Sequence, residues 1–195
     1  MRKIQSVAIV LVFLLAASCG PAPATTGTTA TADDAKSGDV ENDNAEHSGG
    51  GSITDFALKD VNGKTHALSD YLGKKVILIS FWATWCEPCK KEMVQLNKLW
   101  KQYKDQDLLV ISISMDEPES QGDVAPYIKQ RGYEYPVLID AEGAVTNQMN
   151  PRRAAPFTLI IDKSQNIVWE HESYIPGDEK KIEEAIVKII GASAK

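Results

Sequence analysis

The sequence predicts an α/β domain, in which a central sheet is covered by helices on both faces. Continuous apolar runs of strand length recur along the chain, as expected for strands that are buried on both faces. Segments with the apolar periodicity of amphipathic helices separate these runs. Buried strands that alternate with helices are typical of a sheet packed between two helical layers.

The first predicted elements are a hairpin, a buried strand and a helix. The segments DFALKD and THAL flank the turn signal VNGK, which predicts a short hairpin. The continuous apolar run KKVILISFWA predicts a fully buried strand. A helix follows, because large apolar side chains recur at intervals of three and four residues: Met93, Leu96, Trp100 and Tyr103.

The second half of the chain continues the alternation. DLLVISIS and YPVLID predict two further buried strands, and DVAPYIKQRG between them predicts a helix that ends at Gly132. FTLIID and NIVWEH predict two strands joined by a turn. The closing helix has a periodic apolar face made of Ile182, Ala185, Ile186, Ile189 and Ile190.

The first 18 residues have the layout of an export signal. A basic pair precedes an apolar run that is too short to span a bilayer. The sequence LAASC that follows resembles the bacterial lipobox, whose cysteine becomes the lipid-bearing first residue of the mature protein. We therefore expect residues 1–18 to be a signal peptide and Cys19 to carry lipid. The alternatives are an ordinary signal peptide cut near Ser18 and an uncleaved anchor.

Residues 19–52 have the composition of a flexible tether. Small, polar and acidic residues dominate, and Val40 is the only aliphatic side chain larger than alanine after Cys19 in this segment. Such a segment cannot bury enough apolar surface to fold. We therefore expect a lipid-anchored linker at 19–52 and one folded domain at 53–195.

Composition and charge exclude nucleic-acid binding. Charged residues make up 25% and apolar residues 43% of the chain, which is typical of soluble domains. The formal net charge is −6, and the sequence has no basic patch of the kind that binds nucleic acid. Contact with a membrane is expected only through the lipid on Cys19. We expect the domain to be a monomer.

The segment FWATWCEPCKKE places two cysteines three positions apart, where the first buried strand gives way to the helix. If Cys19 carries lipid, Cys86 and Cys89 remain as a closed pair. Cys86 lies near the helix N-cap, where unpaired N–H groups and the macrodipole favour a thiolate. Pro88 suits the first turn, which needs no N–H donor there. We expect Cys86 to attack a partner's disulfide and Cys89, on the same helical face, to resolve the mixed disulfide.

Three other roles for the pair are disfavoured. A structural zinc site needs four ligands, and the only histidines in the chain are three scattered ones. A permanent structural disulfide that closes so short a loop removes little entropy from the unfolded chain, so it would add little stability. Peroxiredoxins have Pro and Thr seven and three residues before the nucleophile, where this chain has Ile79 and Ala83. Redox exchange is the favoured role, with no metal and no cofactor besides the disulfide.

FWATWCEPCKKE and the later segment 135–169 resemble the thioredoxin-fold family, and within it the membrane-tethered TlpA/ResA-like thiol-disulfide oxidoreductases. The resemblance covers about residues 53–190. It implies a thioredoxin-like fold, with a central mixed sheet flanked by helices, an N-terminal hairpin and a helix-strand insertion near 117–140. It also implies that Pro156 is a cis-proline that faces the pair and, together with Ala155, aligns a substrate strand.

The resemblance also implies roles for residues around the pair. Glu92 matches an acidic residue that exchanges protons with a thiol; the alternative is a solvated helix glutamate. Thioredoxin buries an aspartate six residues before the first cysteine, where this chain has Ser80. Because that buried proton acceptor is missing, Glu92 becomes the more important candidate for the role. Trp85 is expected to form part of the docking surface. Glu87 and Pro88, between the cysteines, are expected to tune the redox potential.

Together, the residues and the resemblance predict a lipid-anchored thiol-disulfide oxidoreductase of the bacterial cell envelope. The family implies a reductant that acts outside the cytoplasm on disulfide-bearing proteins such as apocytochrome c. It also implies a membrane thiol-disulfide carrier as electron donor. Two alternatives stay open: an oxidant that forms disulfides, and a copper chaperone that binds metal through the two thiols.

Overall fold

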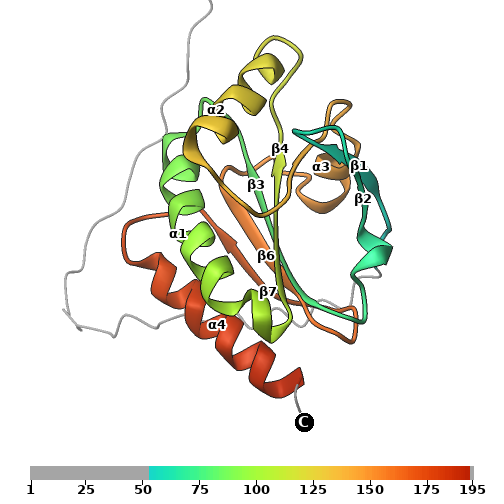
Figure 1. The fold of residues 1–195 in the computed structure, drawn as a ribbon, viewed down its shortest axis with the longest axis vertical. Coiled ribbons are helices and arrows are strands. Elements are labelled where there is room, and N and C mark those ends of the chain that lie inside the picture. Colours follow the sequence, from blue (N-terminus) through green and yellow to red (C-terminus); the bar gives the residue numbers. More distant parts are fainter. Residues whose placement is uncertain (1–52, 194–195) are drawn as a thin grey trace, which may run out of the picture. The chain divides into compact units, whose positions relative to one another are not determined.

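The computed structural model describes residues 53–193, which form a seven-stranded mixed sheet flanked by helices (Figure 1). The strand order is β2-β1-β5-β4-β3-β6-β7. Strands β3, β4 and β5 run parallel to one another, and the other pairs are antiparallel. The expected signal peptide, the linker and Cys19 lie outside the described residues.

The strands follow the apolar runs of the sequence. Their bounds are β1 (Ala57–Asp60), β2 (Thr65–Ala67), β3 (Val76–Trp82), β4 (Leu108–Ser114), β5 (Val137–Ile139), β6 (Phe157–Ile161) and β7 (Ile167–Glu172). β1 and β2 form the predicted hairpin at one edge of the sheet. All seven residues of β3 are buried, as the uninterrupted apolar run predicted.

The helices cover the two faces of the sheet. Their bounds are α1 (Glu87–Tyr103), α2 (Val124–Arg131), α3 (Ala144–Met149) and α4 (Asp178–Ser193). α1 and α4 lie side by side on one face, whereas α3 lies on the other (Figure 1). α2 and β5 form the predicted insertion, and Gly132, in the left-handed region at φ 64°, ends α2 as expected.

The two cores are separated by alternate side chains of the sheet. On β3, Val76, Leu78 and Trp82 pack in the core under α1, α2 and α4. Ile77, Ile79 and Phe81 point to the opposite core, which includes Val145 of α3. This alternation follows from the strand period of two. It leaves Ser80 as a polar residue on the α1 face, facing a helix that begins at the cysteine pair.

α3 was not among the predicted elements. The buried Asp140 accepts hydrogen bonds from the backbone N–H groups of Val145 and Thr146, at 3.3 and 2.7 Å. This carboxylate satisfies donors in the first turn of the helix. A helix of six residues is too short to show an apolar period, so the sequence pattern gave no signal for it.

Candidate redox site

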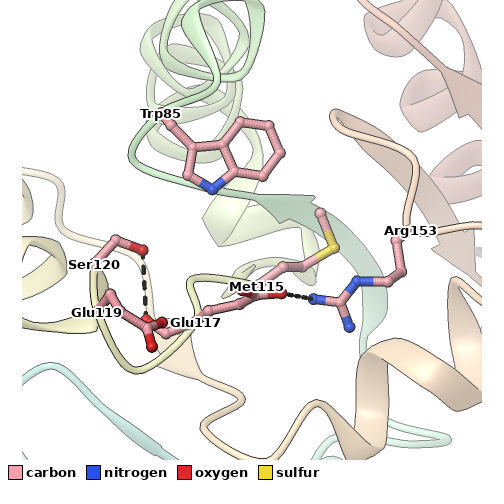
Figure 2. A pocket seen from close by; sticks show the side chains of 6 residues that line it. All are labelled: Trp85, Met115, Glu117, Glu119, Ser120 and Arg153. Atoms are coloured by element: carbon pink, nitrogen blue, oxygen red, sulfur yellow. Dashed lines mark hydrogen bonds and ion pairs between the residues drawn. The ribbon is translucent and has the colours of Figure 1, made fainter. Parts of the chain in front are cut away.

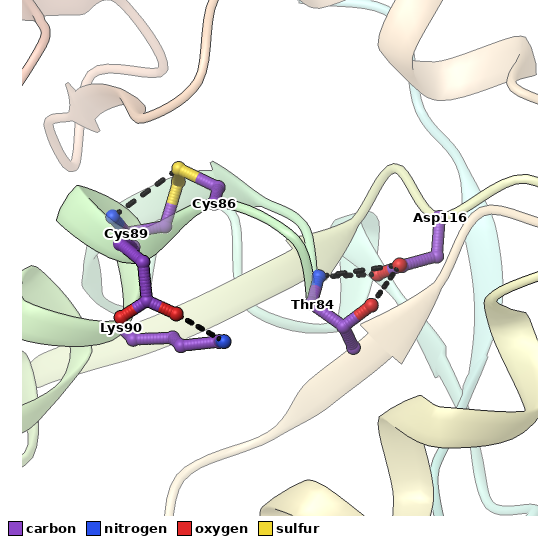
Figure 3. Close-up of polar contacts among 6 residues, drawn as sticks. Thr84, Cys86, Cys89, Lys90 and Asp116 are labelled. Carbon is purple, nitrogen blue, oxygen red and sulfur yellow. Dashed lines mark hydrogen bonds and ion pairs between the residues drawn. A yellow bond between two sulfur atoms is a disulfide. The ribbon is translucent and has the colours of Figure 1, made fainter.

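The Cys86–Cys89 disulfide lies at the N-terminus of α1, directly after β3 and its short loop (Figure 3). Cys86 is the N-cap, as predicted, and its Sγ accepts a hydrogen bond from the backbone N–H of Cys89 at 3.2 Å. The Cα atoms of the two cysteines are 5.3 Å apart. Cys86 is 4% exposed and Cys89 is completely buried, so only Cys86 of the two cysteines is accessible to solvent.

This position supplies the electrostatics that a redox cysteine needs. A helix N-terminus presents unpaired N–H groups and the positive end of the macrodipole, both of which stabilise a thiolate. Pro88 lies in the first turn of α1 and adds no unsatisfied donor. The N–H of Cys89 already points at Sγ of Cys86 and is in place to hold its negative charge when the disulfide is reduced.

Glu92 is buried beneath the pair, between α1 and the sheet. Its carboxylate accepts a hydrogen bond from Ser80 Oγ of β3 and another from Thr158 Oγ1 of β6, each 2.9 Å long. Burial raises the pKa of Glu92 to about 7, although the two hydrogen bonds oppose the shift. The alternative of a solvated helix glutamate is therefore wrong.

Glu92 lies one turn after Cys89 on the buried face of α1. Thus an acid that titrates near neutral pH lies next to the buried cysteine. The two hydroxyl groups that hold it come from neighbouring strands, because Ser80 of β3 pairs with Thr158 of β6. The departure from thioredoxin at Ser80 therefore creates a donor for the Glu92 carboxylate.

The loop before Cys86 is anchored by Asp116, a residue that the sequence analysis did not single out. The Asp116 carboxylate accepts hydrogen bonds from the Thr84 backbone N–H at 3.0 Å and from Thr84 Oγ1 at 2.5 Å (Figure 3). It also accepts one from Ser114 Oγ at 2.8 Å. A sequence signal existed, because Asp116 follows β4 just as the Cys86 loop follows β3. The carboxyl ends of adjacent parallel strands lie together.

The Ala155–Pro156 peptide bond is cis, as the resemblance implied. Pro156 directly precedes β6, whose first residue, Phe157, pairs with Phe81 near the end of β3. The proline therefore lies at the same end of the sheet as the disulfide. Its carbonyl accepts a hydrogen bond from the Ser173 N–H at 2.9 Å. Whether Pro156 and Ala155 align a substrate strand stays a prediction.

A buried asparagine, also missed by the sequence analysis, holds the segment before the proline. The Asn150 side chain accepts a hydrogen bond from the Ala154 N–H at 3.0 Å and donates one to the Ala154 carbonyl at 2.9 Å. Its Nδ2 also lies 3.3 Å from Met115 Sδ. Asn150 is only 3% exposed, so these bonds fix the backbone one residue before the cis peptide.

The surface around the pair carries the other predicted residues. Trp85 is 64% exposed beside Cys86, which agrees with a surface role. Glu87 is exposed, and Lys90 Nζ donates a hydrogen bond to it at 2.6 Å. This hydrogen bond lowers the pKa of Glu87 below its ordinary value.

Within residues 53–193, no three His, Cys, Asp or Glu side chains lie together as a metal site. None of the helices in the described part of the chain has the length and apolar content needed to cross a bilayer.

The order of the strands and the disulfide at the start of α1 define a protein of the thioredoxin-like fold class. Sequence comparison places it more narrowly. The AhpC/TSA family profile matches residues 50–170, so the chain belongs to the AhpC/TSA family.

The curated relatives include proteins named thiol-disulfide oxidoreductase ResA, among them the following two. The protein from Geobacillus kaustophilus is 37% identical over 118 residues, which are 60% of this chain and 66% of the relative. The protein from Bacillus thuringiensis subsp. konkukian is 36% identical over 138 residues, which are 69% of this chain and 74% of the relative. The chain therefore spans slightly less than two thirds of the Geobacillus protein.

Solved structures that share the fold include the following two. A candidate thiol:disulfide interchange protein DsbE from Chlorobium tepidum superposes with a TM-score of 0.66 at 28% identity, over 73% of this chain and 97% of that chain. The exposed lipoprotein thioredoxin Etrx1 of Streptococcus pneumoniae superposes with a TM-score of 0.58 at 29% identity, over 71% and 99%. The predicted thioredoxin-like fold is thereby confirmed.

Proposed function

We propose that this protein reduces disulfides in partner proteins outside the cytoplasm, by thiol-disulfide exchange through Cys86 and Cys89. The observation that carries the proposal is the position of the pair. One sulfur lies at a helix N-cap with solvent contact, the other is buried, and an acid with a pKa of about 7 lies one turn further along the helix. The names of the curated relatives support the same reaction class.

The reaction begins with the pair reduced. The Cys86 thiolate attacks one sulfur of the partner's disulfide, which forms a mixed disulfide and releases the partner's other sulfur as a thiolate that takes a proton from water. Glu92 in its ionised form accepts the proton of the Cys89 thiol. The Cys89 thiolate then attacks Cys86 Sγ, and the second partner sulfur leaves. Two electrons pass to the partner, and the Cys86–Cys89 disulfide is formed.

The protein works as a catalyst only if another protein reduces this disulfide again. We propose a membrane thiol-disulfide carrier as that donor, and apocytochrome c as one class of substrate, because the TlpA/ResA-like resemblance implies both. The basic and apolar leader and Cys19 support a lipid anchor in the cell envelope. The Streptococcus pneumoniae neighbour, named as an exposed lipoprotein, supports the same location. The protein acts as a monomer, without a cofactor besides the disulfide.

The test is insulin reduction by the wild type and by two cysteine variants. Cys86→Ser lowers the rate to the background, because no thiolate remains to attack. Cys89→Ser also stops turnover, but leaves a stable mixed disulfide on Cys86 that mass spectrometry detects. A Cys86→Ser variant that still reduces insulin, or a Cys89→Ser variant that traps no conjugate, contradicts the proposal.

The reduction potential decides the direction of electron flow. A reductant is expected to have a potential of roughly −270 mV or lower, whereas a value near about −120 mV indicates an oxidant that forms disulfides. The potential is measured by equilibration with glutathione buffers. Intact mass of the mature protein tests the anchor, since acyl chains on Cys19 and loss of residues 1–18 are expected together.

A further inference from the structure

A pocket of about 350 Å³ opens beside Trp85, the residue before Cys86, and the exchange reaction described above does not use it (Figure 2). Three segments line it. Trp85 comes from the loop that carries Cys86, Arg153 comes from the segment before Ala155, and the remaining lining residues follow β4: Met115, Glu117, Glu119 and Ser120. The pocket therefore joins the loop of the attacking cysteine to the loop of the cis-proline.

The walls of the pocket are held by buried contacts. Met115 is only 4% exposed, and Asn150 Nδ2 lies 3.3 Å from its Sδ while it also donates to the Ala154 carbonyl. On the other side, Asp116 anchors Thr84, the residue before Trp85. A polypeptide that lies on the cis-proline loop with its cysteine at Cys86 therefore has a neighbouring side chain within reach of a preformed pocket.

The charges around the site leave one carboxylate without a partner. Glu87 pairs with Lys90, and Glu117 lies 3.7 Å from Arg153. Within residues 53–193, Glu119 takes part in no ion pair. Two carboxylates and one guanidinium thus line the pocket, which has an excess of one negative charge.

The exposed aromatic ring adds a second preference for a cation. Figure 2 shows the Trp85 indole on one side of the pocket and the Glu117–Ser120 segment on the other, with the Met115 thioether on the side of Arg153. The face of an indole attracts ammonium and guanidinium groups, and the thioether of Met115 suits an aliphatic stem. An acidic side chain finds only Arg153 here, and this guanidinium already has Glu117 as its partner.

We propose that the pocket binds a lysine or arginine side chain of the substrate protein, next to the cysteine that Cys86 attacks. The stem packs on Trp85 and Met115, and the cationic end pairs with Glu119. This inference rests on the proposed function, because thiol-disulfide exchange at Cys86 is what brings a substrate polypeptide to the pocket. The net charge of −6 favours encounter with a basic partner.

The test uses three short peptides with one intramolecular disulfide, identical except for lysine, norleucine or glutamate next to the attacked cysteine. Pre-reduced protein is mixed with each peptide, and the second-order rate constant is measured under single-turnover conditions. We expect the lysine peptide to react about three- to tenfold faster than the glutamate peptide, with the norleucine peptide between them. About 0.5 M salt narrows this preference, because the charges are exposed.

Glu119→Gln is expected to reduce the lysine preference to less than about twofold. The matched control is Glu184→Gln, which makes the same charge change at an exposed position of α4 and keeps the preference of the wild type. Equal rates for the three peptides, a preference for glutamate, or a lysine preference that survives Glu119→Gln overturns the inference. The norleucine peptide has no charge next to the attacked cysteine, so its reduction tests the proposed function independently of the lysine preference. If no peptide is reduced, the proposed function fails and the inference fails with it.

Discussion

The first two turns of α1 carry two glutamates in different regions of the molecule, and the two environments shift the pKa of the side chain in opposite directions. Glu87, in the first turn, lies on the exposed surface around the disulfide, where the Lys90 hydrogen bond lowers its pKa. Glu92, in the second turn, lies in the buried polar layer below the disulfide, where burial raises its pKa to about 7. The environment, and not the residue type, therefore decides which of the two carboxyl groups is available as an acid or base near neutral pH.

The two regions also differ in how their polar groups are held. Below the disulfide, Glu92 is bound by Ser80 and Thr158 from two strands, and it lies inside the core. On the surface, charged groups are held by single ion pairs, which contribute little to stability and are screened by salt. We therefore expect changes below the disulfide to alter stability and pH dependence, and changes on the surface to alter partner choice and the reactivity of Cys86.

The largest effect is expected for Glu92→Gln. The folded-state pKa of about 7 lies above the ordinary glutamate pKa of 4.5, which the side chain has in the unfolded chain. The stability that this raised pKa represents is fully present below pH 4.5, and it is lost as the pH rises through 7. Glutamine cannot ionise. The free energy of unfolding of Glu92→Gln relative to the wild type therefore rises by about 3 kcal/mol from pH 4.5 to pH 8.

Urea unfolding at pH 4.5, 6 and 8 measures this difference. The same variant is expected to slow resolution of the mixed disulfide by about 100-fold, because Cys89 loses its proton acceptor. A stability difference that does not change with pH means that Glu92 is not the group that titrates. An unchanged rate of resolution means that Cys89 loses its proton by another route.

The second effect concerns the anchor of the Cys86 loop. Asp116→Ala leaves the Thr84 N–H and hydroxyl and the Ser114 hydroxyl without their buried acceptor. We expect a loss of about 2–3 kcal/mol in the free energy of unfolding, together with slower insulin reduction. The control is Asp105→Ala, at an exposed position of the 3-10 helix Lys104–Gln106. Equal stability of the two variants contradicts the role given to Asp116.

The third effect concerns the support of the cis-proline loop. Asn150→Ala removes both hydrogen bonds to Ala154 and the contact with Met115. We expect a loss of about 1–2 kcal/mol in stability and a rise in KM for peptide substrates that exceeds the fall in kcat. Asn147→Ala, at an exposed position of α3, which ends at the residue before Asn150, is the control. A variant with wild-type KM shows that Asn150 has only a structural role.

The same division explains what was predictable from the sequence. Cys86 and Cys89 are local features, because a strand, a turn and a helix with Pro88 in its first turn place both sulfurs without any distant contact. The cis-proline required the family resemblance, since no local pattern indicates it. Asp116 and Asn150 act through backbone groups of other loops, so their roles depend on which loops meet in the fold.

The burial of Glu92 had a signal in the sequence, although its charge kept a solvated position open as the alternative. Cys89, Glu92, Met93 and Leu96 follow the spacing of one apolar stripe, and all four are buried in α1. A glutamate within such a stripe indicates either a surface position or a buried acid with hydrogen-bond donors. The donors Ser80 and Thr158 come from two strands far apart in the chain, so only the assembled sheet distinguishes these two cases.

The smallest effect is expected for Glu87→Gln, on the exposed side of the helix. Removal of this carboxylate takes a negative charge away from the Cys86 thiolate, so the pKa of the Cys86 thiol falls slightly. We expect Cys86 in the reduced protein to react with iodoacetamide less than about threefold faster at pH 6.5, and the gain to disappear in about 1 M salt. Because its lowered pKa keeps Glu87 ionised down to acidic pH, the gain persists from pH 6.5 down to pH 5. The stability difference caused by Glu92→Gln changes across this same range and resists salt, since the group is buried. If the Glu87→Gln effect survives salt, or the Glu92→Gln effect does not, the contrast between a screened surface and a buried acid site is wrong.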